Sequence, residues 1–229
     1  MFSVIVIIGE GEISEKLVEK PGVYVFDLEE KLTKIQGLDI PYASDVSLWV
    51  QNRNLFLGIS RKMSLTQDKK INFEVYSPMY QWKGSHFDMV QKIKTYNAQK
   101  VLPFSIWDSH YLIYADRRNN KGESNIFSEL YKYDIHSGQY VLHQKILTYG
   151  VKDVKHFCFF QRNMKEDFLI ITNSNNTETK TLILKFVDDY FLPFQHIENL
   201  ERVKEWLPVI VSPISFVRNT HKELNNKNI

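Results

Sequence analysis

Apolar and polar residues alternate in short stretches along the whole chain, with turn residues between them. The alternation has a period of two, as in Val46–Val50 and Val154–Phe159, which is typical of β-strands. A helix would place its apolar residues at a period of 3.6, and no stretch keeps that period over three turns. The pattern therefore predicts an all-β chain of short strands.

Four segments of the chain share one arrangement around a glutamine. In each, an aromatic or apolar residue stands four positions before the glutamine, and an aliphatic residue stands two positions after it. The glutamines are Gln36, Gln91, Gln144 and Gln195. Their spacings of 55, 53 and 51 residues indicate an internal repeat. A strand that ends in an aromatic residue precedes each glutamine, and in the first three segments it begins at Tyr24, Tyr80 and Tyr131.

The segments that link the glutamines repeat as well. Nine residues after each of the first three glutamines stands Asp45, Lys100 or Asp153, followed by a valine and an alternating strand. A polar turn, a second apolar strand, a polar loop of variable length and the aromatic strand come next. One unit is therefore four short strands, named A to D in chain order, within about fifty residues.

A four-strand unit with this period is typical of a β-propeller blade. The predicted units span residues 1–38, 45–93, 100–146 and 153–197, with a remnant at 205–217. The blades therefore extend over 1–218, and the polar tail at 219–229 is expected to be disordered. Because the first unit contains only strands B to D, we expect a partial propeller of about four to five antiparallel blades. The alternative is that the last strand A completes the first blade and closes a four-bladed ring.

The unit reads Phe-x-x-x-Gln-x-Ile, Asp-Val, Phe-x-Ile, Tyr-Leu-x-x-Ala-Asp/Asn and Tyr-x-Trp, and it is clearest from Phe87 to Asp116. In this it resembles the epilepsy-associated repeat (EAR, or EPTP) over about residues 2–217. Similar repeats occur in leucine-rich glioma-inactivated proteins and in the thrombospondin-type laminin G domain and EAR repeat protein. The resemblance implies a seven-bladed propeller that is secreted or part of an ectodomain, binds other proteins and catalyses nothing. A signal peptide is then expected outside this chain.

Composition and charge narrow the class of protein. Hydrophobic residues make up 43% of the chain and charged residues 24%, so a buried core is expected. The net charge of +2 is too balanced for binding nucleic acid or an anionic membrane through bulk charge. One cysteine, Cys158, excludes an intrachain disulfide and a cysteine-cluster zinc site. No apolar run approaches the length of a transmembrane helix.

Candidate chemistry is sparse. Asp45 and Asp153 begin strand A, which lines the central channel of a propeller, where carboxylates can coordinate Ca²⁺. In the family that the repeat resembles, acidic residues at this position look like cation ligands, but Lys100 stands between them here. No other cofactor is expected. Cys158 is expected to be a buried structural thiol without an adjacent basic group.

The remaining repeat positions predict structural roles and surfaces. The glutamine amides can bond the backbone of the neighbouring unit and hold the register between blades. Three tryptophans are expected to pack between blades: Trp49, Trp82 and Trp107. Asn175 begins the one glycosylation sequon, in the loop between strands B and C of the fourth unit. The loops 61–72 and 116–125 are long, charged and variable, so they are the expected surfaces for specificity.

The function expected from these patterns is a non-catalytic, extracellular protein-interaction module. It would bind a cell-surface receptor or a matrix protein through the propeller loops and faces. One alternative is an intracellular adaptor of the kelch or WD type, although the double glycine and Gly-His markers of those repeats are absent. Another is an enzyme on a propeller scaffold, for which the strand starts supply only Asp45, Lys100 and Asp153.

Overall fold

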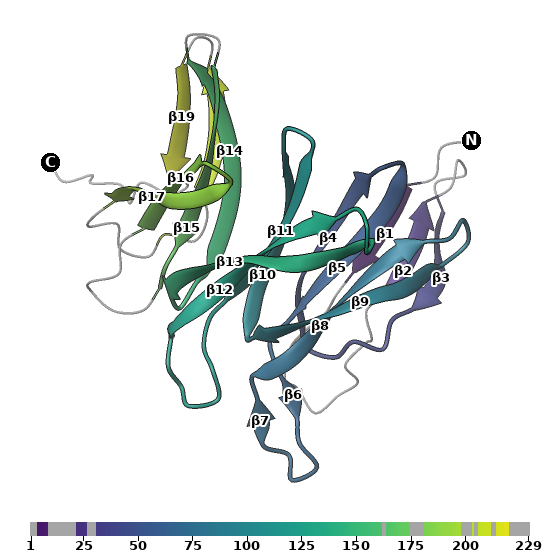
Figure 1. The fold of residues 1–229 in the computed structure, drawn as a ribbon. Coiled ribbons are helices and arrows are strands. Elements are labelled where there is room, and N and C mark those ends of the chain that lie inside the picture. Colours follow the sequence, from purple (N-terminus) through teal and green to yellow (C-terminus); the bar gives the residue numbers. More distant parts are fainter. Residues whose placement is uncertain are drawn as a thin grey trace, which may run out of the picture. The chain divides into compact units, whose positions relative to one another are not determined.

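Figure 1 shows the chain in a computed structural model, which describes residues 4–8, 22–26, 31–161, 164–174, 181–197, 203, 206–211 and 214–219. These residues form strands and turns, and no helix lies among them. The all-β prediction is therefore confirmed. Within the same ranges there is accordingly no helical segment that could cross a lipid bilayer.

Figure 1 labels the strands of the described residues. In chain order they are β1 (Val4–Ile8), β2 (Gly22–Phe26), β3 (Leu32–Gly37), β4 (Ala43–Gln51), β5 (Asn54–Arg61), β6 (Ser64–Leu65), β7 (Ile71–Asn72), β8 (Glu74–Trp82), β9 (Phe87–Tyr96), β10 (Ala98–Ile106), β11 (Ser109–Asp116), β12 (Asn125–Asp134), β13 (Gln139–Tyr149), β14 (Asp153–Gln161), β15 (Met164–Thr172), β16 (Thr181–Val187), β17 (Tyr190–Ile197), β18 (Trp206–Val211) and β19 (Ile214–Asn219).

The predicted four-strand unit is present as a sheet. Strands β4-β5-β8-β9, β10-β11-β12-β13 and β14-β15-β16-β17 each form one sheet in chain order, and β1-β2-β3 and β18-β19 form smaller ones. Strands A and B pair antiparallel in one common register, with Val46 opposite Ile59, Val101 opposite Tyr114 and Val154 opposite Ile171. A short hairpin, β6-β7, lies within the predicted loop 61–72.

The chain divides into two compact units, residues 1–148 and 149–229. The division falls between the third and fourth predicted repeats. The first unit holds the sheets from β1 to β13, and the second holds those from β14 to β19. A single array over 1–218 stays a prediction.

The core of the first unit lies in two layers between successive sheets. One layer joins β1-β2-β3 to the next sheet through Val23, Leu57 and Tyr80, among others. The other joins that sheet to β10-β11-β12-β13 through residues that include Phe56 and Val101. Because neighbours in β5 enter opposite layers, this strand is buried on both faces and reads as a nearly unbroken apolar run.

The sheet of the second unit packs in the same manner. Phe168 and Ile170 of β15 form one buried hydrophobic cluster with Val203 and with Trp206 at the start of β18. The ring of Phe168 also stacks on Phe157, with ring centroids 5.3 Å apart. Aromatic residues on adjacent strands therefore fill the space beside the sheet, as cross-strand pairs commonly do.

Two sequence expectations are wrong. Trp107 does not pack between sheets, because β10 ends at Ile106 and Trp107 lies in the following turn with φ of 53° and 72% of its surface exposed. The positive φ turns its side chain out of the strand alternation. Asn219, predicted to open a disordered tail, instead ends strand β19, opposite Trp206. The rest of that tail lies outside the described residues.

Candidate functional site

The predicted cation ligands lie in different units of the structure. Asp45 is on β4, and its Oδ2 accepts the backbone N–H of Val101 at 3.0 Å. Asp153 is buried at the start of β14 in the second unit. Among the described residues, no three or more His, Cys, Asp or Glu side chains form a group that could hold a metal ion. The Ca²⁺ site thus stays a prediction, while Asp45 has an observed structural contact.

That contact is one of several between the first strands of neighbouring sheets. Ser47 Oγ donates to the carbonyl of Val101 at 2.8 Å. The backbone of Val101 is thus bonded twice, because Asp45 accepts its N–H. Ser44 Oγ donates to the carbonyl of Ala98. Strands β4 and β10 are therefore joined by side chains of β4 that bond the backbone of β10. Each bond satisfies a backbone group that β10 does not use in its own ladder.

Two of the repeat glutamines form paired hydrogen bonds with the next sheet. The Gln36 amide donates Nε2–H to the carbonyl of Phe87 at 2.9 Å and accepts its N–H at 2.7 Å. The Gln91 amide does the same with Tyr140, at 2.7 and 2.9 Å. Each amide imitates one rung of a β-ladder between two separate sheets. We call these paired bonds the glutamine clasps.

A β-bulge precedes the glutamine in each strand D whose register is known. The ladder runs from Gln91 directly to Met89, so Val90 has no partner residue, and the same irregularity skips Ile35 and Phe194. A bulge increases the local twist and redirects the side chains beside it. We attribute the reach of the Gln36 and Gln91 amides toward the next sheet to this distortion. Gln144 is half-buried on β13, and Gln195 is exposed on β17.

The repeat tyrosines sit beside these clasps and differ in environment. Tyr80 and Tyr131 are buried in the two core layers, and burial raises the pKa of both phenols. The Tyr131 hydroxyl donates to Glu129 Oε2 at 2.5 Å, which raises its pKa further. Tyr24 is half-buried, and the Lys34 ammonium lies 5.7 Å from its ring centroid. Tyr80 and Tyr131 thus contribute their rings to the packing between successive sheets.

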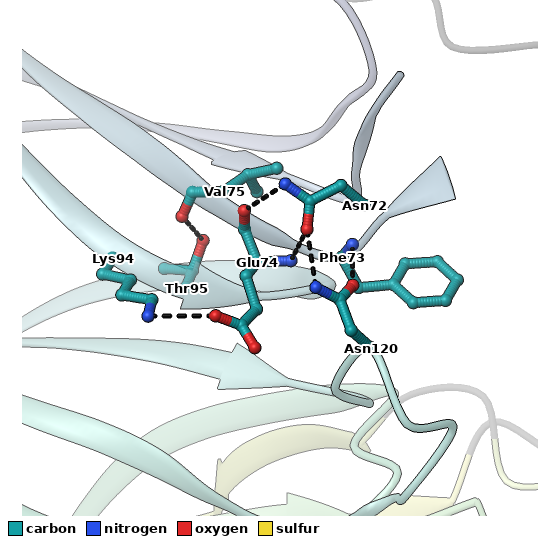
Figure 2. A network of polar contacts seen from close by, with 7 residues as sticks. All are labelled: Asn72, Phe73, Glu74, Val75, Lys94, Thr95 and Asn120. Carbon is teal, nitrogen blue, oxygen red and sulfur yellow. Dashed lines mark hydrogen bonds and ion pairs between the residues drawn. The ribbon is translucent and has the colours of Figure 1, made fainter. Parts of the chain in front are cut away.

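The two loops predicted to carry specificity are joined to each other. We call residues 61–73 and 117–125 together the loop junction, and Figure 2 shows its centre. Asn120 Oδ1 accepts the Phe73 N–H at 2.6 Å, and Asn120 Nδ2 donates to Asn72 Oδ1 at 2.7 Å. Asn72 also bonds the backbone of Glu74 twice: Asn72 Oδ1 accepts the Glu74 N–H at 3.1 Å, and Asn72 Nδ2 donates to the Glu74 carbonyl at 2.9 Å. Side chains from loops of two successive sheets thus form one network.

Each loop also has internal order. In the first, the β6-β7 hairpin closes through Thr66, which bonds the backbone of Lys69 and Lys70. In the second, Asn119 Oδ1 accepts the backbone N–H groups of Lys121 and Glu123 at 3.0 and 3.1 Å. Such side-chain turns replace backbone hydrogen bonds that loops otherwise lose. The loop junction is therefore held in a defined shape.

Asp116 anchors the second loop at its base. Its buried carboxylate accepts the N–H of Tyr96 at the end of β9 at 3.0 Å, and Asn173 accepts the N–H of Tyr149 at the end of β13 at 3.0 Å in the same way. Burial raises the pKa of Asp116 well above its ordinary value, although the Tyr96 hydrogen bond acts against this. The Asp/Asn position of the repeat motif is the sequence signal for this role, although the motif alone did not indicate what the side chain bonds.

A cleft borders the loop junction on the side of β12 and β13. Its volume is about 250 Å³, and its lining includes Tyr96, Asn119, Phe127, Glu129 and Lys145. Glu129 lies 3.4 Å from the Lys145 ammonium and also accepts the Tyr131 hydroxyl. The cleft therefore offers amide, aromatic and paired charged groups close to the two loops.

A further polar cluster lies on the sheet of the second unit. Asp167 is buried and bonds His156 Nε2 at 2.9 Å and the Lys165 ammonium at 3.0 Å. Burial opposes ionisation of Asp167, but these two hydrogen bonds lower its pKa below the ordinary value. Cys158 lies directly opposite Asp167 in the ladder and is partly exposed. The expectation that Cys158 is buried is thus wrong.

No protein-family model matches the chain, and no curated protein sequence matches it either. The predicted glycosylation site, Asn175, lies outside the described residues.

Proposed function

We propose that the chain is a non-catalytic protein-interaction module, built as part of a β-propeller of the epilepsy-associated repeat type and acting outside the cell. The observation that carries the proposal is the repeated way in which successive sheets are joined. In the first unit, apolar layers lie on both faces of the middle sheet, and the glutamine clasps cross them at one repeat position. Radially packed antiparallel blades are the architecture that such sheets build.

Binding rather than catalysis is supported by how the polar side chains are used. Asp45, Asp116 and Gln91 are engaged in bonds that hold backbone segments together. The loops 61–73 and 117–125 add exposed polar and charged side chains on a sheet scaffold, and binding specificity commonly resides on such loops. The loop junction and the neighbouring cleft give this scaffold a shaped surface for a cell-surface receptor or matrix protein.

The extracellular assignment rests on the repeat resemblance and on the sequon at Asn175. Asn175 follows strand β15, in the same B-to-C connection that forms the loop junction in the second and third sheets. Such connections lie at the end of a blade and are accessible to a glycan. A Ca²⁺ ion at Asp45 or Asp153 is a minor part of the proposal.

The test is a binding screen of the chain against a panel of receptor ectodomains and matrix proteins, measured by biolayer interferometry. We expect saturable binding to at least one of them, at a stoichiometry of one site for each chain. Secretion is tested separately by expressing the full-length gene product in mammalian cells and measuring the mass at Asn175 after glycosidase treatment. Retention in the cytosol with unmodified Asn175 would contradict the extracellular assignment.

A further inference from the structure

We propose that the loop junction binds an acidic protein segment that also carries apolar side chains. This inference rests on the proposed interaction function and names the surface and the chemistry of its partner.

The first support is a segregation of charge. Four basic residues and Asp68 give residues 61–73 a charge of +3, and three basic residues with Glu123 give 117–125 a charge of +2. The whole chain carries only +2, so all other residues together carry −3. Because Asn120 joins the two loops, these positive charges form one surface instead of two. A basic surface on an otherwise weakly acidic protein steers acidic partners toward it.

The carboxylates that flank this surface are already engaged. Glu74 lies 3.0 Å from the Lys94 ammonium, as Figure 2 shows. Asp116 is buried beneath the second loop and accepts the Tyr96 N–H. Neither acid is therefore positioned to neutralise the loop cations, which leaves their field directed into solvent.

Six of these seven cations have no acidic partner within ion-pair distance among the described residues. They are Lys62, Lys69, Lys70, Arg117, Arg118 and Lys121, and the four lysines are exposed. The seventh, Arg61, is half-buried and donates to the carbonyls of Pro41 and Tyr76. Arg118 stacks over the Phe73 ring at 5.5 Å, which holds its guanidinium beside the network of Figure 2. Burial and the neighbouring Arg118 charge both lower the pKa of Arg117. An incoming carboxylate would relieve this repulsion between like charges.

Apolar side chains are exposed within the same surface. Leu65 and Ile71 face each other across the β6-β7 hairpin, and each exposes about half of its surface. The turn between them carries Lys69 and Lys70. A partner that buries this pair gains hydrophobic contact in addition to charge pairing. A sulfated polysaccharide would use the charges but leave the Leu65–Ile71 pair uncovered, so the observations favour a protein segment.

The fixed shape of the loops supports binding as well. The Asn119 and Asn120 networks order both loops before a partner arrives. Less conformational entropy is then lost on association than a flexible loop would lose. The positive groups are presented at set positions, as a specific interface requires.

The experiment measures fluorescence anisotropy of a labelled twelve-residue peptide in which Glu alternates with Leu and Phe. A peptide with Lys in place of Glu and a heparin oligosaccharide are tested in parallel, all with the full chain. The charge-reversal variant is K69E/K70E on the hairpin turn, and L65S/I71S removes the apolar pair. The matched control is K83E/K92E, which makes the same charge change in β9 and the turn before it. Circular dichroism confirms that each variant is folded.

We expect saturable binding of the acidic peptide, weakened by raising NaCl from 50 to 300 mM, and no binding of the basic peptide. K69E/K70E should weaken the affinity at least about tenfold, and K83E/K92E less than about twofold. L65S/I71S should weaken peptide binding and leave heparin binding unchanged. Equal peptide affinity in all variants would overturn the proposal. So would a peptide affinity that L65S/I71S leaves unchanged, together with competition by heparin for the same site.

A second experiment separates this inference from the function on which it rests. Random peptides displayed on phage are selected on the wild-type chain and then measured on K69E/K70E. Selected ligands that bind both proteins equally would contradict the loop junction as the binding surface but leave the interaction function intact. The absence of any selected ligand would count against both. Acidic, apolar ligands that fail to bind K69E/K70E support the inference.

Discussion

The glutamine clasps allow a direct test of how the sheets are joined. Replacing Gln91 with methionine keeps the length and volume of the side chain but removes the amide. The substitution deletes the Nε2–H bond to the Tyr140 carbonyl and the acceptor of the Tyr140 N–H, at 2.7 and 2.9 Å. Both bonds lie in a partly buried region between two sheets, where water replaces them incompletely.

The expected loss follows from these two bonds. A hydrogen bond contributes about 1 kcal/mol net, and a partner left without a bond costs about as much again when water reaches it poorly. We therefore expect Gln91→Met to lower the free energy of unfolding by about 2 kcal/mol, within a range of about 1–4 kcal/mol. In urea this corresponds to a midpoint lower by about 1 M if the m-value is about 2 kcal/mol/M.

The assay combines urea unfolding with hydrogen exchange. The Tyr140 amide should exchange about thirtyfold faster in Gln91→Met, which is the factor for about 2 kcal/mol if exchange occurs through opening of this contact. Gln195→Met is the matched control, because Gln195 holds the same repeat position with an exposed side chain. It should change stability by less than about 0.5 kcal/mol. Equal stability of the two variants, with unchanged exchange at Tyr140, would refute the reasoning.

Three other substitutions test other contacts. Asp116→Asn should keep the turn bond, as Asn173 does in the second unit, and flatten the pH dependence of the melting temperature. Because burial raises the Asp116 pKa, the stability that this pKa shift contributes to the wild-type protein is greatest below pH 3.8, the ordinary pKa, and is lost as pH rises. A melting temperature that depends on pH between 4 and 8 in the same way in both proteins would contradict this prediction. Lys165→Met should raise the pH of acid unfolding, since the lowered Asp167 pKa stabilises the fold above its unfolded pKa and this gain is lost as pH falls; an acid midpoint that does not move would count against that ion pair. Gly58→Ala should cost about 1–3 kcal/mol in thermal unfolding, because its Cβ would lie 3.1 Å from a tryptophan ring and a valine methyl, whereas a neutral outcome would mean that the layer has room to adjust.

The four-strand unit could be predicted because it depends on local patterns of apolar and polar residues. Strand alternation depends only on which residues face a core, and the repeat places Val46, Val101 and Val154 at one register position without reference to distant contacts. The length and charge of the loops 61–72 and 116–125 are also local properties, and they mark both loops as candidate surfaces. What could not be predicted there was the β6-β7 hairpin, whose two short strands are stabilised by the turn chemistry around Thr66.

The tertiary structure decided which groups meet across long separations in the chain. The repeat pattern predicted that Trp107 packs between blades, but the left-handed turn at Trp107 places most of that ring in solvent. The balanced net charge did not reveal the basic loop junction, because the two loops come together through contacts of Arg118 and Asn120 with residues about 45 or more positions away. Spacing in the sequence measures distance along the backbone, whereas charge and hydrogen bonding act through space. Local residue patterns are thus sufficient to specify the strands and their repeat, whereas the surface that the sheets present depends on how successive sheets pack.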